Sequence, residues 1–458
     1  MEKKRKSYRQ KQKEGKKRMM FTNKQLKKLL IPLLIEQLLS ITVGLADSMM
    51  IASVSEAAVS AVSLVDTVMV LLINVFAALA TGGAVVSGQY IGHGDDDKAC
   101  KAADQLILFI VVLALAITAL TYGGKNLILN GIFGKIEPDV MENAEIYLLI
   151  VSASIPFIAL YNGGAALFRA MGDSKPPMKT SLLMNLVNIV GNAILIYGLK
   201  IGIAGAAIPT LISRIFAAVY ILLLLRKQNQ QIHLAQKPVL HFEMHTVRKI
   251  LHIGVPNGLE NSMFQVGKIL VLSLVSGFGT ASIAANAVSN TIAMFQILPG
   301  SAAGMAILTV VSQCVGAKEV DQVKYYTKKL LKFAYLAMIQ MNIAVVLLLP
   351  GIVWIYQLSE ETSQITKAIV LYHGACCVTI WPLSFSLPNT LRAANDVRFT
   401  MWIAIISMWI FRIAFSYLLG QTLGWGVFGI WVAMTIDWLF RSICFVVRYV
   451  RGKWIEKM

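Results

Sequence analysis

The stretch IPLLIEQLLSITVGLADSMM, residues 31–50, decides the fold class of this chain. A helix of about 20 residues crosses the roughly 30 Å of hydrocarbon in a bilayer, and this stretch has that length. Two carboxylates, Glu36 and Asp47, interrupt the apolar run. Because an ionised group in hydrocarbon is energetically costly, these carboxylates predict a polar cavity or a polar neighbouring helix beside this span.

Apolar segments of similar length recur along the whole chain of 458 residues, of which 57% are hydrophobic and only 14% charged. A soluble domain carries about 25% charged residues. The composition therefore excludes a disordered protein, a secreted disulfide scaffold and an ordinary cytosolic enzyme. We predict an all-α polytopic membrane protein with twelve transmembrane helices, near residues 27–53, 59–87, 104–123, 146–168, 178–198, 203–225, 250–275, 281–311, 328–349, 366–390, 399–419 and 427–449.

The positive charge is concentrated at the N-terminus. Residues 1–28 hold 13 Lys and Arg against two Glu, so this tail contributes +11 of the net charge of +18. Loops rich in Lys and Arg stay on the cytoplasmic side of a membrane, and most of the other basic residues also fall in alternate loops. We therefore expect a multi-pass plasma-membrane protein with both termini in the cytoplasm. Its tail would contact anionic lipid, and nucleic acid is not an expected partner.

The two halves of the sequence resemble each other. Shifts of 224 and 223 residues match Pro32 with Pro256, Glu36 with Glu260, Gln89 with Gln313, and LFRAMGD (167–173) with TLRAAND (390–396). Six helices per half is an even number, so both halves have the same orientation, as in transporters that rock one lobe against the other. We predict two pseudo-symmetric lobes, with a basic tail at 1–28, an N-lobe at 29–225, a cytoplasmic linker at 226–249, a C-lobe at 250–450 and a C-terminus at 451–458.

Asp47 is the strongest candidate for an ion site. Glu36 and Asp47 are eleven residues apart, which places them about 20° apart on one helix face, three turns from each other. A carboxylate in that position binds Na⁺ through oxygen or accepts H⁺, and either event changes its charge. The alternative, an aspartate that only hydrogen-bonds neighbouring helices, stays open.

A second polar stripe runs along the seventh span. Its members are Asn257, Asn261, Gln265 and Lys268, with Glu260 one residue off the stripe. We expect Glu36, Glu260, Asn257, Asn261 and Gln265 to be candidates for the cavity or the substrate. Glu260 can pair with Lys268 or with a substrate ammonium, and Lys268 itself is interpreted as a structural or gating charge.

The last span carries Asp437 and Arg441 at positions i and i+4, where they can neutralise each other. We predict a structural or gating pair from this spacing. Arg214 and Arg412 also lie in apolar spans and have no partner visible in the sequence. Their roles are not assigned. Pro32 and Pro256, at matching positions of the first and seventh spans, are candidate hinges.

The chain resembles the multidrug and toxin compound extrusion (MATE) family over almost its whole length after residue 28. The motifs that carry the resemblance are residues 31–50, GGAVVSGQYIG (82–92), LFRAMGDSKPP (167–177) and TLRAANDVRFT (390–400), in that order and partly duplicated. The resemblance implies a two-lobed exporter of organic, often cationic compounds in exchange for Na⁺ or H⁺. It implies no enzyme activity and no cofactor, and we expect a monomer.

The resemblance also implies partners for Asp47. Asn188 and Asn192 on the fifth span and Thr210 on the sixth match family positions that surround the first-span aspartate. They supply neutral oxygens of the kind that a hard cation prefers, so a bound metal would be Na⁺ at Asp47. Some members have a carboxylate in place of Asn192, and one branch has a coupling carboxylate at the position of Phe264, so the choice between Na⁺ and H⁺ stays open.

Two other functions are weaker alternatives. A lipid-linked saccharide flippase of similar two-lobed design would line its cavity with several cationic residues that hold a pyrophosphate. Lys268, Arg214 and Arg412 keep this alternative open, although the stripes are mostly acid and amide. An intramembrane enzyme would need clustered His, Asp or Cys with catalytic spacing, and neither such a pattern nor a nucleotide-binding loop occurs in the sequence.

Overall fold

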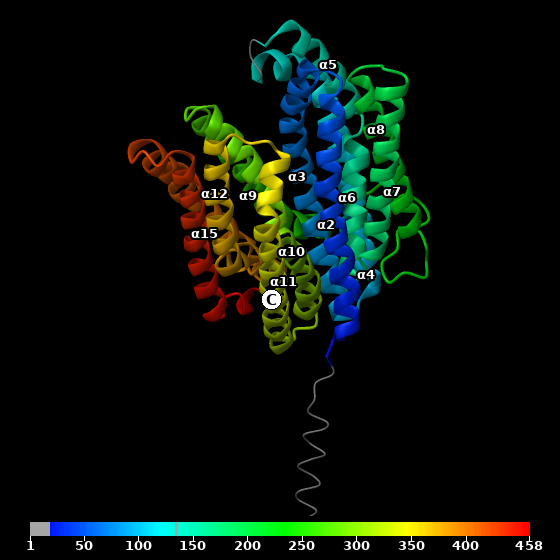
Figure 1. Ribbon diagram of the computed structural model, residues 1–458. Helices are drawn as coiled ribbons and strands as arrows, with labels where there is room; N and C mark the ends of the chain where they lie inside the picture. Colours follow the sequence, from blue (N-terminus) through cyan, green and yellow to red (C-terminus); the bar gives the residue numbers. More distant parts are fainter. Residues whose placement is uncertain (1–18, 133–135) are drawn as a thin grey trace, which may run out of the picture.

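A computed structural model describes residues 19–132 and 136–458 of the chain, and it shows a helical molecule (Figure 1). Residues 1–18 of the basic tail and Lys135 of an expected outer loop lie outside the described residues. The first half contains α2 (Asn23–Ala52), α3 (Glu56–His93), α4 (Asp96–Gly123), η1 (Leu127–Ile132), α5 (Pro138–Ser152), α6 (Ile155–Ala170), α7 (Lys175–Asn192), η2 (Ala193–Gly198) and α8 (Ala204–Leu225).

The second half repeats this order. It contains α9 (Met244–Ser276), α10 (Thr280–Gly316), α11 (Val320–Ile355), α12 (Glu360–Thr379), η3 (Pro382–Ser386), α13 (Pro388–Ala393), α14 (Val397–Ser407), η4 (Met408–Ala414), η5 (Tyr417–Thr422), α15 (Gly426–Val450) and η6 (Ile455–Lys457). The segments η1 to η5 are π-helical and η6 is a 3-10 turn.

The prediction of a twelve-helix membrane protein fits this fold. Within the described ranges, nine helices are long and apolar enough to span a bilayer. Two more spans are bent pairs: α5 with α6 meet at 47°, and α12 with Pro382–Ala393 meet at 57°. Pro156 and Pro382 lie at these bends, where a proline removes a backbone donor. The polar helix α9 completes the set of twelve.

The two halves also share unusual backbone conformations. Gly172 and Asn395, which are 223 residues apart, both have positive φ, of 78° and 65°. Gly94 and Lys318, 224 residues apart, do so as well, with φ of 83° and 57°. A left-handed residue ends a helix by turning the chain sharply, and Gly and Asn adopt this conformation at low cost. The internal repeat thus extends to the turns between the helices.

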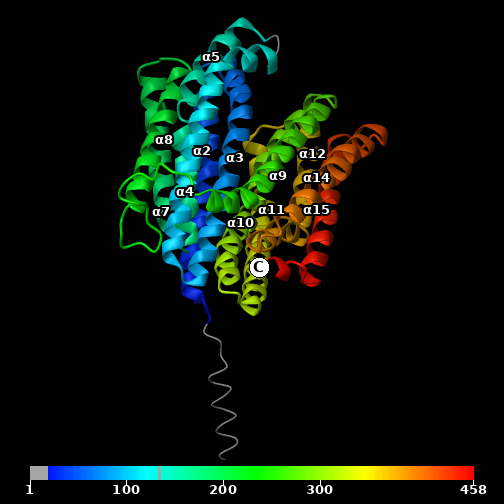
Figure 2. The same ribbon diagram turned by 180° about the vertical axis from the view of Figure 1, so that it is seen from behind.

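Two helical bundles form the lobes, one from α2–α8 and one from α9–α15 (Figures 1 and 2). They lie against each other at the end of the molecule where residue 19 and the C-terminus lie, which we call the tail side. Toward the opposite side the two bundles diverge in both views. The lobes are therefore joined at one end of the molecule.

The first helix of each half crosses into the other lobe. Leu26, Leu29 and Leu33 of α2 belong to an apolar core that is otherwise built from the second half of the chain, on α10, α11 and α13. Ile250 and Ile253 of α9 belong to the core of the first half. The lobe boundaries at 29–225 and 250–450 remain a prediction, and the two cores exchange helix ends across them.

A close crossing of α3 and α10 joins the lobes on the tail side. A Cβ atom at Gly92 would overlap the carbonyl oxygen of Gln313, and one at Gly316 would overlap the carbonyl of Gln89. Gln89 Nε2 donates a hydrogen bond to the carbonyl of Ala393 at 2.9 Å, and Gln313 Nε2 donates to the carbonyl of Ala170 at 2.6 Å. Each glutamine thus binds the equivalent loop of the opposite lobe.

Candidate functional site

Asp47 lines a polar cavity of about 560 Å³ in the N-lobe. The walls come from α2, α3, α5, α7 and α8, with two residues of α9 on one side. Asp66 of α3 contributes a second carboxylate, and Tyr147 donates a long hydrogen bond of 3.5 Å to it. The position of Asp66, which the sequence left open, is therefore at this cavity.

The two asparagines of α7 hold the Asp47 carboxylate. Asn192 Nδ2 donates to Asp47 Oδ1 at 2.7 Å. When the Asn188 amide is oriented so that its oxygen accepts from Thr210 Oγ1 at 3.1 Å, its nitrogen donates to both oxygens of Asp47, at 2.8 and 3.2 Å. The structure therefore brings together all four residues of the expected site.

The packing of α7 against α8 explains why these residues meet. A Cβ atom at Gly191 would lie 2.7 Å from the Cβ of Pro209, so only glycine allows this approach of the two helices. Thr210 follows Pro209 directly and faces Asn188. The π-helical segment η2 begins immediately after Asn192, and such wide turns are frequent beside functional sites.

Arg214 of α8 has a partner that no sequence pattern indicated. Its Nη1 donates to Ser154 Oγ at 2.7 Å, and Ser154 lies between α5 and α6 at the bend of that span. The contact joins residues 60 positions apart, so helical periodicity gives no signal for it. Arg214 thus ties α8 to the bend of the neighbouring span.

Glu36 and Glu260 form equivalent ion pairs in the two lobes. Arg169 Nη1 lies 3.1 Å from Glu36 Oε1, and Arg392 Nη2 lies 2.8 Å from both oxygens of Glu260. Both arginines come from the matched loops at 167–173 and 390–396. Glu36 does not line the cavity of Asp47. Its placement as a substrate candidate is wrong for that cavity, because Arg169 neutralises it on the tail side of the helix.

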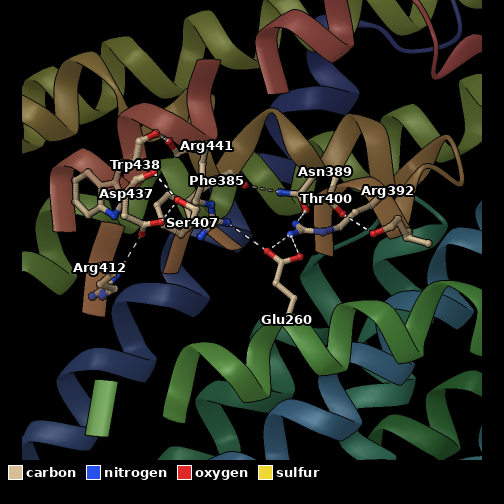
Figure 3. A network of polar contacts seen from close by, with 12 residues as sticks. Glu260, Phe385, Asn389, Arg392, Thr400, Ser407, Arg412, Asp437, Trp438 and Arg441 are labelled. Carbon is tan, nitrogen blue, oxygen red and sulfur yellow. Dashed lines mark hydrogen bonds and ion pairs between the residues drawn. The ribbon is translucent and has the colours of Figure 1, made fainter. Parts of the chain in front are cut away.

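The predicted pair of Asp437 with Arg441 does not form. Arg441 Nη2 binds Glu260 Oε1 at 3.2 Å, while Asp437 accepts a short hydrogen bond from Ser407 and lies 3.8 Å from Arg412 Nη1 (Figure 3). The i, i+4 spacing permits contact but does not enforce it. Residues from α9 and η4 are closer competitors. Arg412, unassigned from the sequence, is thereby the partner of Asp437.

Glu260 lies at the edge of a second cavity, of about 350 Å³, inside the C-lobe. Lys268 lines the same cavity, but Glu260 is bound to Arg392 and Arg441 and not to Lys268. The expectation that Glu260 pairs with Lys268 is therefore wrong. The two arginines reach it from α13 and α15, which no local pattern on α9 reveals.

The polar stripe of α9 divides between the two cavities. Asn261 and Lys268 line the C-lobe cavity, whereas Gln265 lines the N-lobe cavity opposite Asp47. Asn257 is buried and lines neither of these two cavities. One helix therefore contributes to both polar spaces.

The family model described as MatE matches residues 32–194 and 256–418, which are equivalent parts of the two halves. The chain belongs to the MatE family. MATE proteins are secondary transporters, so this chain is a multi-pass membrane transporter for drugs and toxic compounds and not an enzyme. Like other MATE proteins, it uses no cofactor and is coupled to an ion gradient.

Known MATE proteins match it over nearly their whole length. An uncharacterized transporter of Bacillus subtilis, YisQ, is 27% identical, with 93% of this chain and 94% of that protein covered. The probable multidrug resistance protein NorM of Thermotoga maritima is 23% identical over 95% and 93%. A structure titled as the outward-facing conformation of a multidrug resistance MATE transporter of the MOP superfamily has a TM-score of 0.88 at 20% identity, covering 95% and 96%.

Proposed function

We propose that this MATE protein is an antiporter that exports small organic compounds in exchange for Na⁺ or H⁺, and that Asp47 is the residue that couples the two fluxes. The proposal keeps Asn188, Asn192 and Thr210 as the surroundings of the coupling ion. The relatives named as multidrug resistance proteins support drug export as the task.

A buried oxygen beside Asp47 carries the proposal. Asn192 Oδ1 is buried and accepts no hydrogen bond from the described part of the chain, although Asn192 Nδ2 binds Asp47. A buried acceptor without a donor is costly, whereas a cation would satisfy it. Carboxylate and amide oxygens are the ligands that hard cations prefer. A proton on Asp47 would likewise supply a donor within this cluster of oxygens.

The mechanism follows from the joined tail side. When the tail side faces the cytoplasm, as the basic N-terminus predicts, the described arrangement keeps the lobes together inside and apart outside. A cation that binds Asp47 neutralises its charge and changes which arrangement of the lobes is favoured. The inward ion and the outward compound are coupled because both bind within the same two-lobed molecule. The expected plasma-membrane location and monomeric state belong to this proposal.

The decisive experiment uses proteoliposomes with separately imposed sodium and proton gradients. Asp47→Asn removes the titratable, ion-binding oxygen while keeping the hydrogen bonds, so ion-driven export of ethidium should fall to the protein-free level. Asp139→Asn is the matched control, because Asp139 is exposed on α5 and makes the same change of charge outside both cavities. Wild-type rates in Asp47→Asn under both gradients would refute the proposed role.

The flippase alternative is not favoured by the family membership. The expectation of cationic substrates suits the N-lobe cavity, where Asp47 and Asp66 provide negative charge. It does not suit the C-lobe cavity, whose charges are mostly positive.

A further inference from the structure

The C-lobe cavity collects more positive than negative charge. Lys268, Arg392, Arg412 and Arg441 all line it, and Glu260 is the acidic residue among the lining side chains. Asp437 adds one negative charge behind Arg412, at 3.8 Å. Four basic groups against two acidic ones leave an excess of two positive charges.

The acidic groups are already used. Glu260 is shared between Arg392 and Arg441, with the nearest oxygen and nitrogen atoms 2.8 and 3.2 Å apart (Figure 3). Arg412 Nη1 is buried, and it forms no hydrogen bond with residues 19–132 or 136–458, because Asp437 is too distant for one. Donors of Arg412 thus remain free beside the cavity.

Lys268 and Arg412 meet at one aromatic ring. Lys268 Nζ lies 5.1 Å and Arg412 Cζ lies 4.7 Å from the centroid of the Phe264 ring. No ion pair joins Lys268 to an acidic residue within the described ranges. Two like charges at one ring repel each other unless a negative group lies between them or near both.

Aromatic side chains supply the rest of the cavity wall. Trp381 and Phe385 stack with their centroids 4.8 Å apart, and Phe385 meets Trp438 edge to face at 5.8 Å. All three line the cavity. Its volume of about 350 Å³ lies within the range of small-molecule pockets, roughly 300–1,000 Å³. A flat apolar ring fits such a wall.

We propose that the C-lobe cavity binds an organic anion, with an aromatic body against the tryptophans and a sulfonate, carboxylate or phosphate group at Lys268 and Arg412. The proposal names a substrate class for the exporter and rests on the proposed function in that respect. The anionic group can belong to a free compound or to a lipid headgroup, since the same side chains would bind either.

Binding is tested with two probes that differ only in charge. Titration calorimetry compares 1-naphthalenesulfonate with (1-naphthyl)trimethylammonium on the full chain in nanodiscs of neutral phosphatidylcholine. The wild type should bind the sulfonate at least about tenfold more tightly than the ammonium, as expected for one close charge pair. Equal affinity, or a preference for the ammonium, would overturn the proposal without any variant.

Substitution of Lys268 assigns the effect to the cavity. Lys268→Gln should weaken sulfonate binding about tenfold, Lys268→Arg should retain it, and Lys268→Glu should reverse the preference. Lys101→Gln is the matched control, because Lys101 is exposed on α4 outside the cavity. Unchanged sulfonate affinity in Lys268→Gln, in protein that elutes as the wild type does, would refute the site.

Nanodiscs that contain phosphatidylglycerol distinguish the two sources of the anion. A lipid headgroup in the cavity would compete with the sulfonate in the wild type and not in Lys268→Gln, whereas a site for free compounds would show no such competition. The calorimetry needs no ion gradient. Loss of ion-driven transport with intact sulfonate binding would therefore count against the antiport mechanism, and the reverse result would count against this site alone.

Discussion

Glu36 and Glu260 occupy equivalent positions in the two lobes, and an arginine of the matched loop binds each of them. A buried ion pair is not by itself strongly stabilising, because its desolvation cost offsets much of the attraction. Removing one partner is different, since the other charge then stays buried and unpaired. These pairs therefore fix where the loops at 167–173 and 390–396 attach to α2 and α9.

Arg169→Gln should lower the free energy of unfolding by about 3–5 kcal/mol, because it leaves Glu36 buried without its cation. The double variant Glu36→Gln/Arg169→Gln should regain most of that loss. Thermal unfolding in detergent measures both. The exposed pair of Lys125 and Glu145 is the control, and Lys125→Gln should cost less than about 1 kcal/mol. Equal losses at the two pairs would contradict this account.

At the scale of helices, the crossing of α3 and α10 depends on two glycines whose missing side chains allow the carbonyls of Gln313 and Gln89 to approach. The sequence repeat showed that Gly92 and Gly316 match, but not that each packs against the other half. Hydropathy located most spans within a few residues. It gave no sign of the π-helical segments, such as η2 and η5, because their residues are as apolar as those of an α-helix.

Gly92→Leu should separate the lobes on the tail side. An overfilled contact costs about 1–3 kcal/mol, which is enough to shift the populations of the two arrangements several-fold to more than 100-fold. Distances between spin labels on α3 and α10, measured by electron paramagnetic resonance, should lengthen at the tail side. Gly123→Ala is the control, because a Cβ atom there meets no other atom within 4 Å. Unchanged distances in Gly92→Leu would refute the tight crossing.

For the whole molecule, the sequence repeat correctly predicted two lobes, and Asp47 with its three neighbours could be placed by resemblance to the family. The exchange of helix ends between the lobes could not be foreseen, since an apolar residue such as Leu29 carries no label for the core it joins. The pairing of Arg441 failed for the same reason. Contacts over more than 100 residues depend on how the bundles dock.

The exchanged helix ends should hold a cut chain together. A protease site inserted between Gln236 and Lys237, both exposed in the linker, should leave two fragments that co-elute in mild detergent after cleavage. Leu29→Ser/Leu33→Ser should weaken this association, because both side chains are buried in the core of the other half. Ile35→Ser/Leu38→Ser, at exposed positions of α2, should not. Separation of the wild-type fragments would contradict the exchange.

The helix α9 carries Gln265 toward one polar space and Lys268 toward the other. The two positions are less than one turn apart, so a rotation of α9 reshapes both compartments at once. This shared partition imposes a trade-off on adaptation. A change on α9 that admits a new compound on one face alters the surroundings of Asp47 on the other, so selectivity and energy conversion cannot be tuned independently through this helix.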